Sequence, residues 1–294
     1  MPNRNSLLSL LVLFGLWGVA PPALGQVLVP HTLQIDSDRL EQQGLSLAQE
    51  AAQLAQFQQF EMALPRARLA TQLAPKNYQS WFLLGGLYLQ TNKFNEALAA
   101  LQQARSLEPK NASILFALGI ANFQQEKYDA AVQNLQAGLK LKPDDAEGRF
   151  DLANAYYKMD RLPDAVDQYN RVLALDKQFW PAINNIGLIK YEQGEVETAL
   201  KQWQAALAIK KQAAEPQMAM AVALYAKGDR KQSLAMGEAA LRIDSRHADL
   251  EYLKQQLWGD RLLSATKKFL ETPRIQATLQ EIANQPAPVQ VAPQ

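Results

Sequence analysis

The sequence predicts an all-α protein built as a solenoid, in which six similar helical hairpins stack one after another. Three observations support this prediction. The chain aligns with itself at a spacing of 34 residues, without a gap, from Gly44 to His247. Small residues recur at two fixed places in each unit, and turn-forming or helix-capping residues recur where the expected helices end. Self-similarity at a fixed period is typical of repeat architectures, in which each unit packs only on its neighbours.

Each unit is expected to form two helices that pack closely against each other. The six units are 44–77, 78–111, 112–145, 146–179, 180–213 and 214–247. The eighth residue of every unit is Gly or Ala, and the twentieth is Ala in five units and Ser233 in the last. Larger apolar residues lie between these places at helical spacing, so they are expected to fill the seam between the two helices.

Residues suited to turns and caps separate the expected helices. Four residues that tolerate a left-handed backbone hold the same place inside their hairpins; they are Asn92, Asp160, Gly194 and Gly228. At three unit boundaries a helix-capping residue precedes the next helix; these are Asn77, Asn111 and Asp145. The first three units end their second helix at a Pro, whereas the last three have Lys177, Lys211 and Ser245 there, which predicts longer helices in those units.

The second unit carries the fullest motif. Eight of its residues stand where the tetratricopeptide repeat has Trp, Leu, Gly, Tyr, Ala, Phe, Ala and Pro; they are Trp81, Leu84, Gly85, Tyr88, Ala97, Leu101, Ala104 and Pro109. Only Leu101 departs from the pattern, and it is apolar. The chain therefore resembles the tetratricopeptide repeat (TPR) family over residues 44–247. The resemblance implies a right-handed superhelical solenoid of six helix-turn-helix repeats, with a concave groove lined by the first helix of each repeat.

The residues after the repeats are expected to close the open end of the stack. An apolar stripe of Leu250, Leu253 and Leu257 predicts a capping helix between Ala248 and Phe269. A second short helix is expected at Pro273–Ala283, so residues 248–283 form the capping and C-terminal helices. Residues 284–294 are rich in Pro and uncharged, which predicts a disordered tail.

The N-terminal residues 1–25 have the pattern of a secretory signal. Arg4 precedes an apolar run at 7–20, two prolines end the run, and small residues lead to Gly25. We expect cleavage after Gly25, and the alternative is an uncleaved membrane anchor. In both cases the repeats are expected on the non-cytoplasmic side, exported to a periplasm or lumen or tethered there. Residues 26–43 are expected to hold a linker and the start of the first helix.

Groove residues follow from the resemblance, because in this family positions 2, 5, 9, 12 and 13 of each repeat face the groove. Aromatic residues recur here at positions 5 and 12, and in peptide-binding members Asn at positions 9 and 6 contacts the backbone of an extended peptide. The predicted partner-binding groove consists of Phe82, Phe116, Phe123, Phe150, Asn154, Tyr157, Asn185, Tyr191 and Tyr225. Two alternatives stay open: the rings pack against a neighbouring repeat, and the Asn side chains form local hydrogen bonds between helices.

Composition argues against several other functions. The 30 Lys and Arg residues nearly balance the 29 Asp and Glu residues, so a nucleic-acid partner is not expected. There is no Cys, and the two His residues lie far apart, so no metal site is expected. The sequence contains no supported nucleophile–base pair, and we expect no cofactor and no catalytic residue.

The sequence therefore predicts a non-catalytic scaffold or assembly factor that binds a protein or peptide partner in its groove. A self-assembling structural envelope protein, which would be a homo-oligomer, is the first alternative. The second is a photosynthetic-membrane biogenesis factor tethered by its N-terminal segment. The layout of one apolar segment and a bare repeat array resembles such factors, among them the TPR protein that interacts with protochlorophyllide oxidoreductase.

Overall fold

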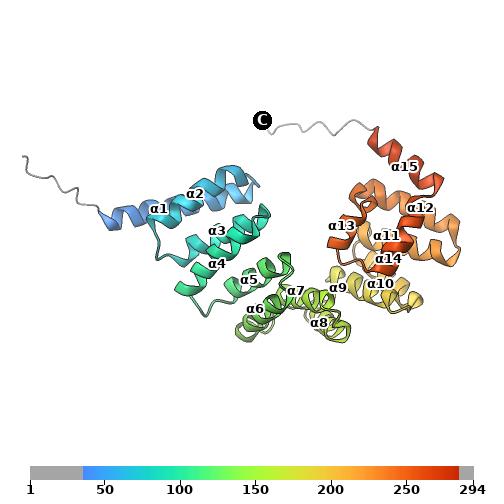
Figure 1. Ribbon diagram of the computed structural model, residues 1–294, viewed down its shortest axis with the longest axis horizontal. Helices are drawn as coiled ribbons and strands as arrows, with labels where there is room; N and C mark the ends of the chain where they lie inside the picture. Colours follow the sequence, from blue (N-terminus) through green and yellow to red (C-terminus); the bar gives the residue numbers. More distant parts are fainter. Residues whose placement is uncertain (1–35, 285–294) are drawn as a thin grey trace, which may run out of the picture. The chain divides into compact units, whose positions relative to one another are not determined.

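The helices of the computed structural model follow the predicted hairpins in order (Figure 1). The structure describes residues 36–284, so the predictions for segment 1–25 and for most of the Pro-rich tail lie outside the described residues. The first helices of the six repeats are α1 Ser37–Gln56, α3 Tyr78–Gln90, α5 Ala112–Gln124, α7 Ala146–Lys158, α9 Trp180–Glu192 and α11 Ala214–Lys227. The second helices are α2 Phe60–Leu73, α4 Phe94–Leu107, α6 Tyr128–Leu141, α8 Leu162–Leu175, α10 Val196–Ile209 and α12 Arg230–Ile243.

This arrangement confirms the predicted all-α fold of consecutive hairpins. Each first helix contacts the second helix of its own hairpin in repeats two to six, and each second helix contacts the first helix of the next repeat. The described residues contain no β-strand. The repeats belong to one compact unit that starts at Asp38.

The predicted turns and caps form as the sequence indicates. The turn residues have positive φ angles in all four hairpins, from 56° at Asn92 and Asp160 to 100° at Gly228. Asn77 and Asp145 each accept a hydrogen bond from a backbone N–H of the helix that follows, over 2.8 Å in both cases. Asn111 accepts two such bonds. These side chains satisfy N–H groups that have no partner inside their own helix.

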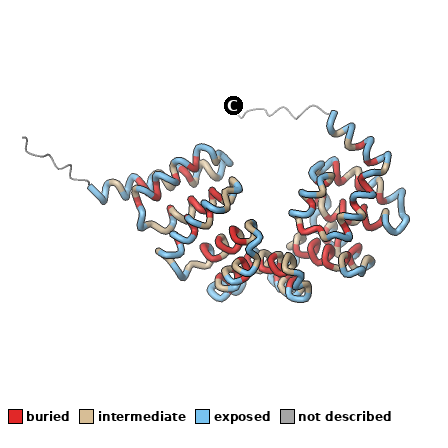
Figure 2. The backbone as a smooth tube through the Cα atoms, viewed as in Figure 1, coloured by how far each residue is buried: buried red, intermediate tan, exposed pale blue. Residues whose placement is uncertain are grey.

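Close approach of the paired helices depends on the small residues. A Cβ atom added at Gly85 would lie 2.6 Å from Cγ of Leu101, and one added at Gly187 would lie 2.6 Å from Nε1 of Trp203. Both distances are shorter than real Cβ contacts, so only Gly fits here without movement. Figure 2 shows the resulting core as buried residues along the helix faces that meet within and between hairpins.

The ends of the helices can be compared with the sequence prediction. The first helix, α1, begins at Ser37, inside the segment 26–43 that was expected to hold a linker and the helix start. The longer second helices expected in the last three repeats do not form, so that prediction is wrong. The helices α8, α10 and α12 end at Leu175, Ile209 and Ile243, at the same repeat position as Leu107 and Leu141. The position at which the second helix ends is therefore the same in repeats with and without the terminal Pro.

The C-terminal residues form a cap of four short helices, where a capping helix and one further short helix were expected. They are η1 Ser245–Ala248, α13 Leu250–Gln255, α14 Asp260–Leu270 and α15 Pro273–Ala283. The expected helix from Ala248 to Phe269 is broken after Gln255, where Leu257 has a φ angle of 69°. The helix α15 spans the residues predicted for it and contacts α12, as an end cap should. The helix α14, however, contacts α9 and α11, the first helices of repeats five and six.

Candidate functional site

Positions 2, 5, 9, 12 and 13 of the six first helices are the surface on which the sequence places a partner. We call it the first-helix surface. The structure divides this surface into two parts. The part on repeats four to six is contacted by the C-terminal cap. The part on repeats one to three carries a groove between α1 and α3, and a pocket lies at the turns of repeats two and three. The predicted partner-binding residues fall into both parts, with different surroundings.

The cap is held on repeats five and six by two carboxylate groups. Glu192, at the end of α9, accepts hydrogen bonds from the backbone N–H groups of Arg261 (3.0 Å) and Leu262 (2.9 Å) in the first turn of α14. A carboxylate at a helix N-terminus is favourable because it meets both the unpaired N–H groups and the positive end of the helix dipole. Glu215 in α11 accepts a hydrogen bond of 3.2 Å from Nε1 of Trp258.

Apolar packing makes the cap part of the core. Seven large side chains of the cap are buried in one cluster with Trp203 and the residues of α11; they are Leu253, Leu257, Trp258, Leu262, Phe269, Leu270 and Ile275. Burying each large apolar side chain contributes roughly 1.5–3 kcal/mol. The cap is therefore part of the hydrophobic core, and removing it would expose these side chains to water.

Two predicted groove aromatics lie beneath this cap. Tyr191 is only 3% exposed, its ring centre is 5.9 Å from that of Trp203, and the guanidinium carbon of Arg261 lies 5.2 Å from its ring centre. The ring of Tyr225 meets that of Phe269 edge to face at 5.4 Å. The expectation that Tyr191 faces an open groove is wrong, because C-terminal residues of the chain cover its ring.

The two predicted Asn residues belong to an internal hydrogen-bond network. The Tyr169 hydroxyl donates to Oδ1 of Asn154 over 2.6 Å. Nδ2 of Asn185 lies 3.1 Å from both Asn154 Oδ1 and the Tyr169 hydroxyl oxygen. Asn185 is 5% exposed. In the structure these side chains therefore form the local hydrogen bonds that the sequence left open as an alternative.

Phe116 and Phe150 pack within the array. The ring of Phe116 fills the space that two glycines leave, since a Cβ atom at Gly138 or Gly148 would lie 2.5–2.6 Å from its atoms. The ring of Phe150 lies 5.7 Å from that of Tyr169 and 5.1 Å from that of Phe179, between ring centres. Both residues are half-buried, so most of their contact area is used between neighbouring helices.

Phe82 lies in a groove on the first-helix surface. The groove has a volume of about 780 Å³ and runs between α1 and α3. It is lined by Ala52, Ala55, Gln56, Gln58, Phe60, Phe82, Leu83, Gly86, Leu87 and Gln90. Gly86 leaves its floor open, because a Cβ atom added there would meet no atom within 4 Å.

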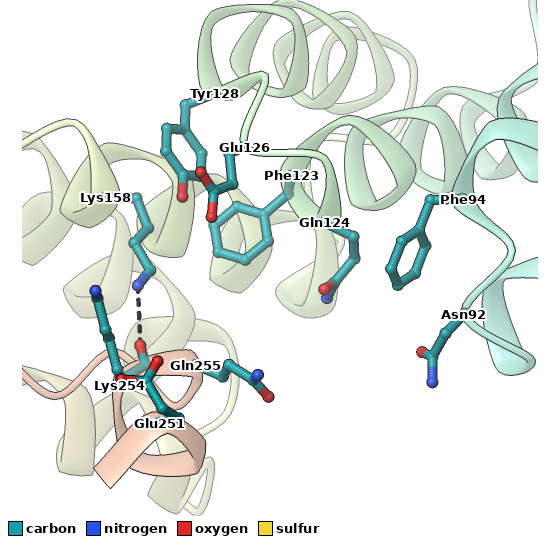
Figure 3. A pocket seen from close by; sticks show the side chains of 10 residues that line it. All are labelled: Asn92, Phe94, Phe123, Gln124, Glu126, Tyr128, Lys158, Glu251, Lys254 and Gln255. Carbon is teal, nitrogen blue, oxygen red and sulfur yellow. Dashed lines mark hydrogen bonds between the residues drawn. The ribbon is translucent and has the colours of Figure 1, made fainter.

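Phe123 lines a second pocket, of about 480 Å³, at the turns of repeats two and three (Figure 3). The wall opposite comes from α13, where the carbonyl of Lys254 accepts a hydrogen bond of 3.0 Å from Nζ of Lys158. Burial lowers the pKa of Lys158 below its usual value, and the nearby Glu126 partly offsets this. Aromatic rings, amides and charges of both signs line this pocket, which makes it more polar than the groove at Phe82.

Tyr157 packs against the core cluster that includes the cap. Its hydroxyl group is buried and has no hydrogen-bond partner among residues 36–284. Burial, together with the nearby carboxylates, raises the pKa of this hydroxyl above its ordinary value. The ring therefore supports the junction of α7 and the cap.

Two acidic residues of the first helices, one in α7 and one in α11, were not among the predicted site residues. Burial raises the pKa of Asp151 to about 7, and the charges of Glu147 and Asp145 raise it further. Burial also raises the pKa of Glu215 to about 7, against hydrogen bonds from Trp258 and Asn184 that lower it. The sequence shows the carboxylates near Asp151 but not the burial of either group, because only the folded chain encloses them.

The structure is a solenoid of stacked helical hairpins, and two family models match parts of the chain. The TPR repeat model matches residues 85–126, 121–160 and 187–228. A second model, of ChAPs (Chs5p-Arf1p-binding proteins), matches residues 30–105. No curated protein sequence matches the chain significantly. The matched segments have the pattern of tetratricopeptide repeats, as the sequence motif indicated.

Solved structures support the same fold. PilW, described as a widely conserved type IV pilus biogenesis factor, has a TM-score of 0.63 at 17% identity, over 80% of this chain and 98% of its own. PilF of Pseudomonas aeruginosa has a TM-score of 0.59 at 18% identity, over 75% and 98%. YrrB, described as a TPR protein with an unusual peptide-binding site, has a TM-score of 0.51 at 22% identity, over 65% and 94%. Among residues 36–284, no helix has the length and hydropathy that crossing a membrane requires.

Proposed function

We propose that this protein is a non-catalytic interaction scaffold or assembly factor that binds a partner polypeptide on repeats one to three. The observation that carries the proposal is the groove of about 780 Å³ between α1 and α3. Repeats five and six are filled by the chain's own cap, so the remaining first-helix surface is where a partner has room. Concave sites with an apolar lining and a few polar groups are typical of binding sites.

The relatives fit this proposal. A peptide-binding site is described for YrrB and pilus biogenesis for PilW, and both share the TPR fold with this chain. Binding and assembly are the activities that a surface of stacked helices supports without catalysis. Phe82 and Phe123 are the predicted residues that we assign to partner contact, because both line open pockets.

We also propose that the repeats act outside the cytoplasm, on the basis of the signal-like residues 1–25. N-terminal sequencing of the mature protein tests whether the chain is cleaved after Gly25. Protease added to intact cells and to cells with a permeabilised outer barrier should degrade the repeats only in the second case. Protection of the repeats in both preparations, with digestion only after the inner membrane is broken, would contradict an exported location.

The groove itself is tested by photo-crosslinking in cells. A photoreactive amino acid at Gln90, which lines the groove, should give a crosslinked polypeptide. The same group at Gln102, exposed on the second helix α4, is the matched control and should not. Filling the groove floor with Gly86→Met should abolish the product at position 90. Crosslinking that is equal at both positions, or unaffected by Gly86→Met, would refute binding in this groove.

Self-assembly is the second candidate, and one observation favours it. The first hairpin exposes four large apolar side chains, including Phe57 at 76%; the others are Leu45, Met62 and Leu69. Several large apolar side chains exposed on one hairpin are consistent with an interface. Light scattering over a concentration series should show a mass that grows with concentration if this hairpin joins two copies, and Met62→Gln with Leu69→Gln should remove that growth. A constant monomer mass for the unmodified chain would exclude this candidate.

A further inference from the structure

The partner segment for the groove at α1 and α3 can be described by its chemistry. We infer that it is an α-helix that presents an uncharged, apolar face. This inference rests on the proposed function and adds the class of partner. Three features of the first-helix surface carry it: the absence of charge, the small residues of the groove floor, and the helix that the chain itself lays on the equivalent surface of later repeats.

Charge separates the two parts of the first-helix surface. At positions 2, 5, 9, 12 and 13 of repeats one to three, every residue is apolar, Gly, Ser or Gln. In repeats four to six the same positions include Glu147, Lys158, Glu192 and Glu215. None of the described residues that line the groove at Phe82 is charged. A charged side chain buried in this groove would lose its hydration and would find no counter-ion among the lining residues. The face of the partner helix that contacts the groove is therefore uncharged.

Three glutamines border this uncharged surface. Gln56, Gln90 and Gln124 occupy position 13 of three successive repeats, and all three are exposed. An amide both donates and accepts hydrogen bonds and carries no charge. Such a row suits the polar side chains that flank the apolar face of an amphipathic helix.

The groove floor has room for the backbone of a helix. It is made of Ala52, Ala55 and Gly86, and a Cβ atom at Gly86 would meet no atom within 4 Å. Packed helices lie about 8–10 Å apart, and the shorter distances require small residues at the contact. Gly inside a helix is unfavourable by roughly 1 kcal/mol relative to Ala. Unlike Gly85, Gly86 has no packing neighbour within the described chain that explains it.

The chain supplies an example of the proposed ligand. The helix α14 contacts α9 and α11, which are successive first helices, as α1 and α3 are. Its buried residues are Leu262, Thr266, Phe269 and Leu270, which follow the spacing of an amphipathic helix. Figure 1 shows α14 beside these two helices. The groove between α1 and α3 is likewise formed by two successive first helices. Among the described residues, no further helix of this chain lines it.

Synthetic peptides test the inference on the full chain. The probe is a fluorescein-labelled peptide of about 15 residues, long enough to form a helix, with Leu and Phe on one face and Gln and Ser on the other. One relative of this peptide has a central Pro, and another has a Lys on the apolar face. Fluorescence anisotropy should show that the neutral peptide binds. The affinities of the Pro peptide and of the Lys peptide should each be lower by a factor of about ten or more. The affinity of the neutral peptide should change less than about twofold between low and high salt, since no ion pair forms.

Variants tie the binding to the groove. Gly86→Met should abolish binding of the neutral helix, and Gly86→Glu should reverse the preference so that the Lys peptide binds more tightly. Gln102→Glu places a charge on the exposed side of α4 and should change nothing. Far-UV circular dichroism checks that each variant remains helical.

The outcomes separate this inference from the proposed function. Equal binding of the Pro peptide would show an extended ligand and overturn the inference. Tight binding of the Lys peptide by the unmodified chain would overturn it as well. If a partner crosslinks at Gln90 but no helical peptide binds, the inference of a helical ligand is wrong and the proposed scaffold function is retained. If no crosslink forms at Gln90, both the inference and the proposed binding in this groove are wrong.

Discussion

Replacing two adjacent glycines by alanine, one at a time, should change the stability of the protein in opposite directions. Gly85 and Gly86 lie next to each other in α3. In a helix interior, Ala is more favourable than Gly by roughly 1 kcal/mol, so each replacement starts with the same gain. At Gly86 the new Cβ atom meets no atom within 4 Å. Gly86→Ala should therefore raise the free energy of unfolding by about 0.5–1 kcal/mol.

At Gly85 packing reverses the result. The new Cβ atom would lie 2.6 Å from Cγ and 2.7 Å from Cδ2 of Leu101, which is fully buried. Forcing one carbon atom into a packed core costs typically about 1–3 kcal/mol, which exceeds the helical gain. Gly85→Ala should therefore lower the free energy of unfolding, by about 1 kcal/mol if Leu101 shifts only partly.

Urea unfolding followed by far-UV circular dichroism measures both changes. Repeat arrays can unfold in parts, so hydrogen exchange in α3 and α4 should be measured alongside the global curve. Exchange there should slow in Gly86→Ala and accelerate in Gly85→Ala. Changes of the same sign and size in the two variants would refute the assignment of Gly85 to helix contact and of Gly86 to open surface.

Three further results are expected. Glu192→Gln should weaken the start of α14 by about 1–2 kcal/mol through loss of a charged cap; hydrogen exchange in α14 measures this, and the exposed Glu195→Gln should leave it unchanged. Because burial raises the pKa of Glu215 to about 7, above the 4.5 of the unfolded chain, the folded state holds the proton more tightly, and stability falls as pH rises through this range. The slope, at most about 1.4 kcal/mol per pH unit, should shrink in Glu215→Gln when unfolding is compared near pH 5 and pH 8. Phe116→Ala should cost about 3 kcal/mol in urea unfolding, because the ring fills the space at two glycines; an unchanged curve would show that the ring is free for a partner.

The repeat motif predicted local structure well and side-chain surroundings poorly. The left-handed turns at Asn92 and Asp160, and the helix caps at Asn77 and Asp145, depend on residues within a few positions of each other. Such local preferences are carried by the sequence. The aromatic column was read from the same motif, yet Tyr191 is covered by residues about seventy positions further along the chain.

By itself, the sequence determined the period, the pairing of helices into hairpins and the first-helix positions, because these follow from spacing and from the small residues at each hairpin. The absence of charge at positions 2, 5, 9, 12 and 13 of repeats one to three can also be read from the sequence. Only the tertiary structure decided which part of the surface is open. The C-terminal residues 250–270 fold back onto α9 and α11, held by Glu192 and Glu215. Contacts between such distant residues depend on the shape of the assembled repeats, and no periodic pattern in the chain encodes them.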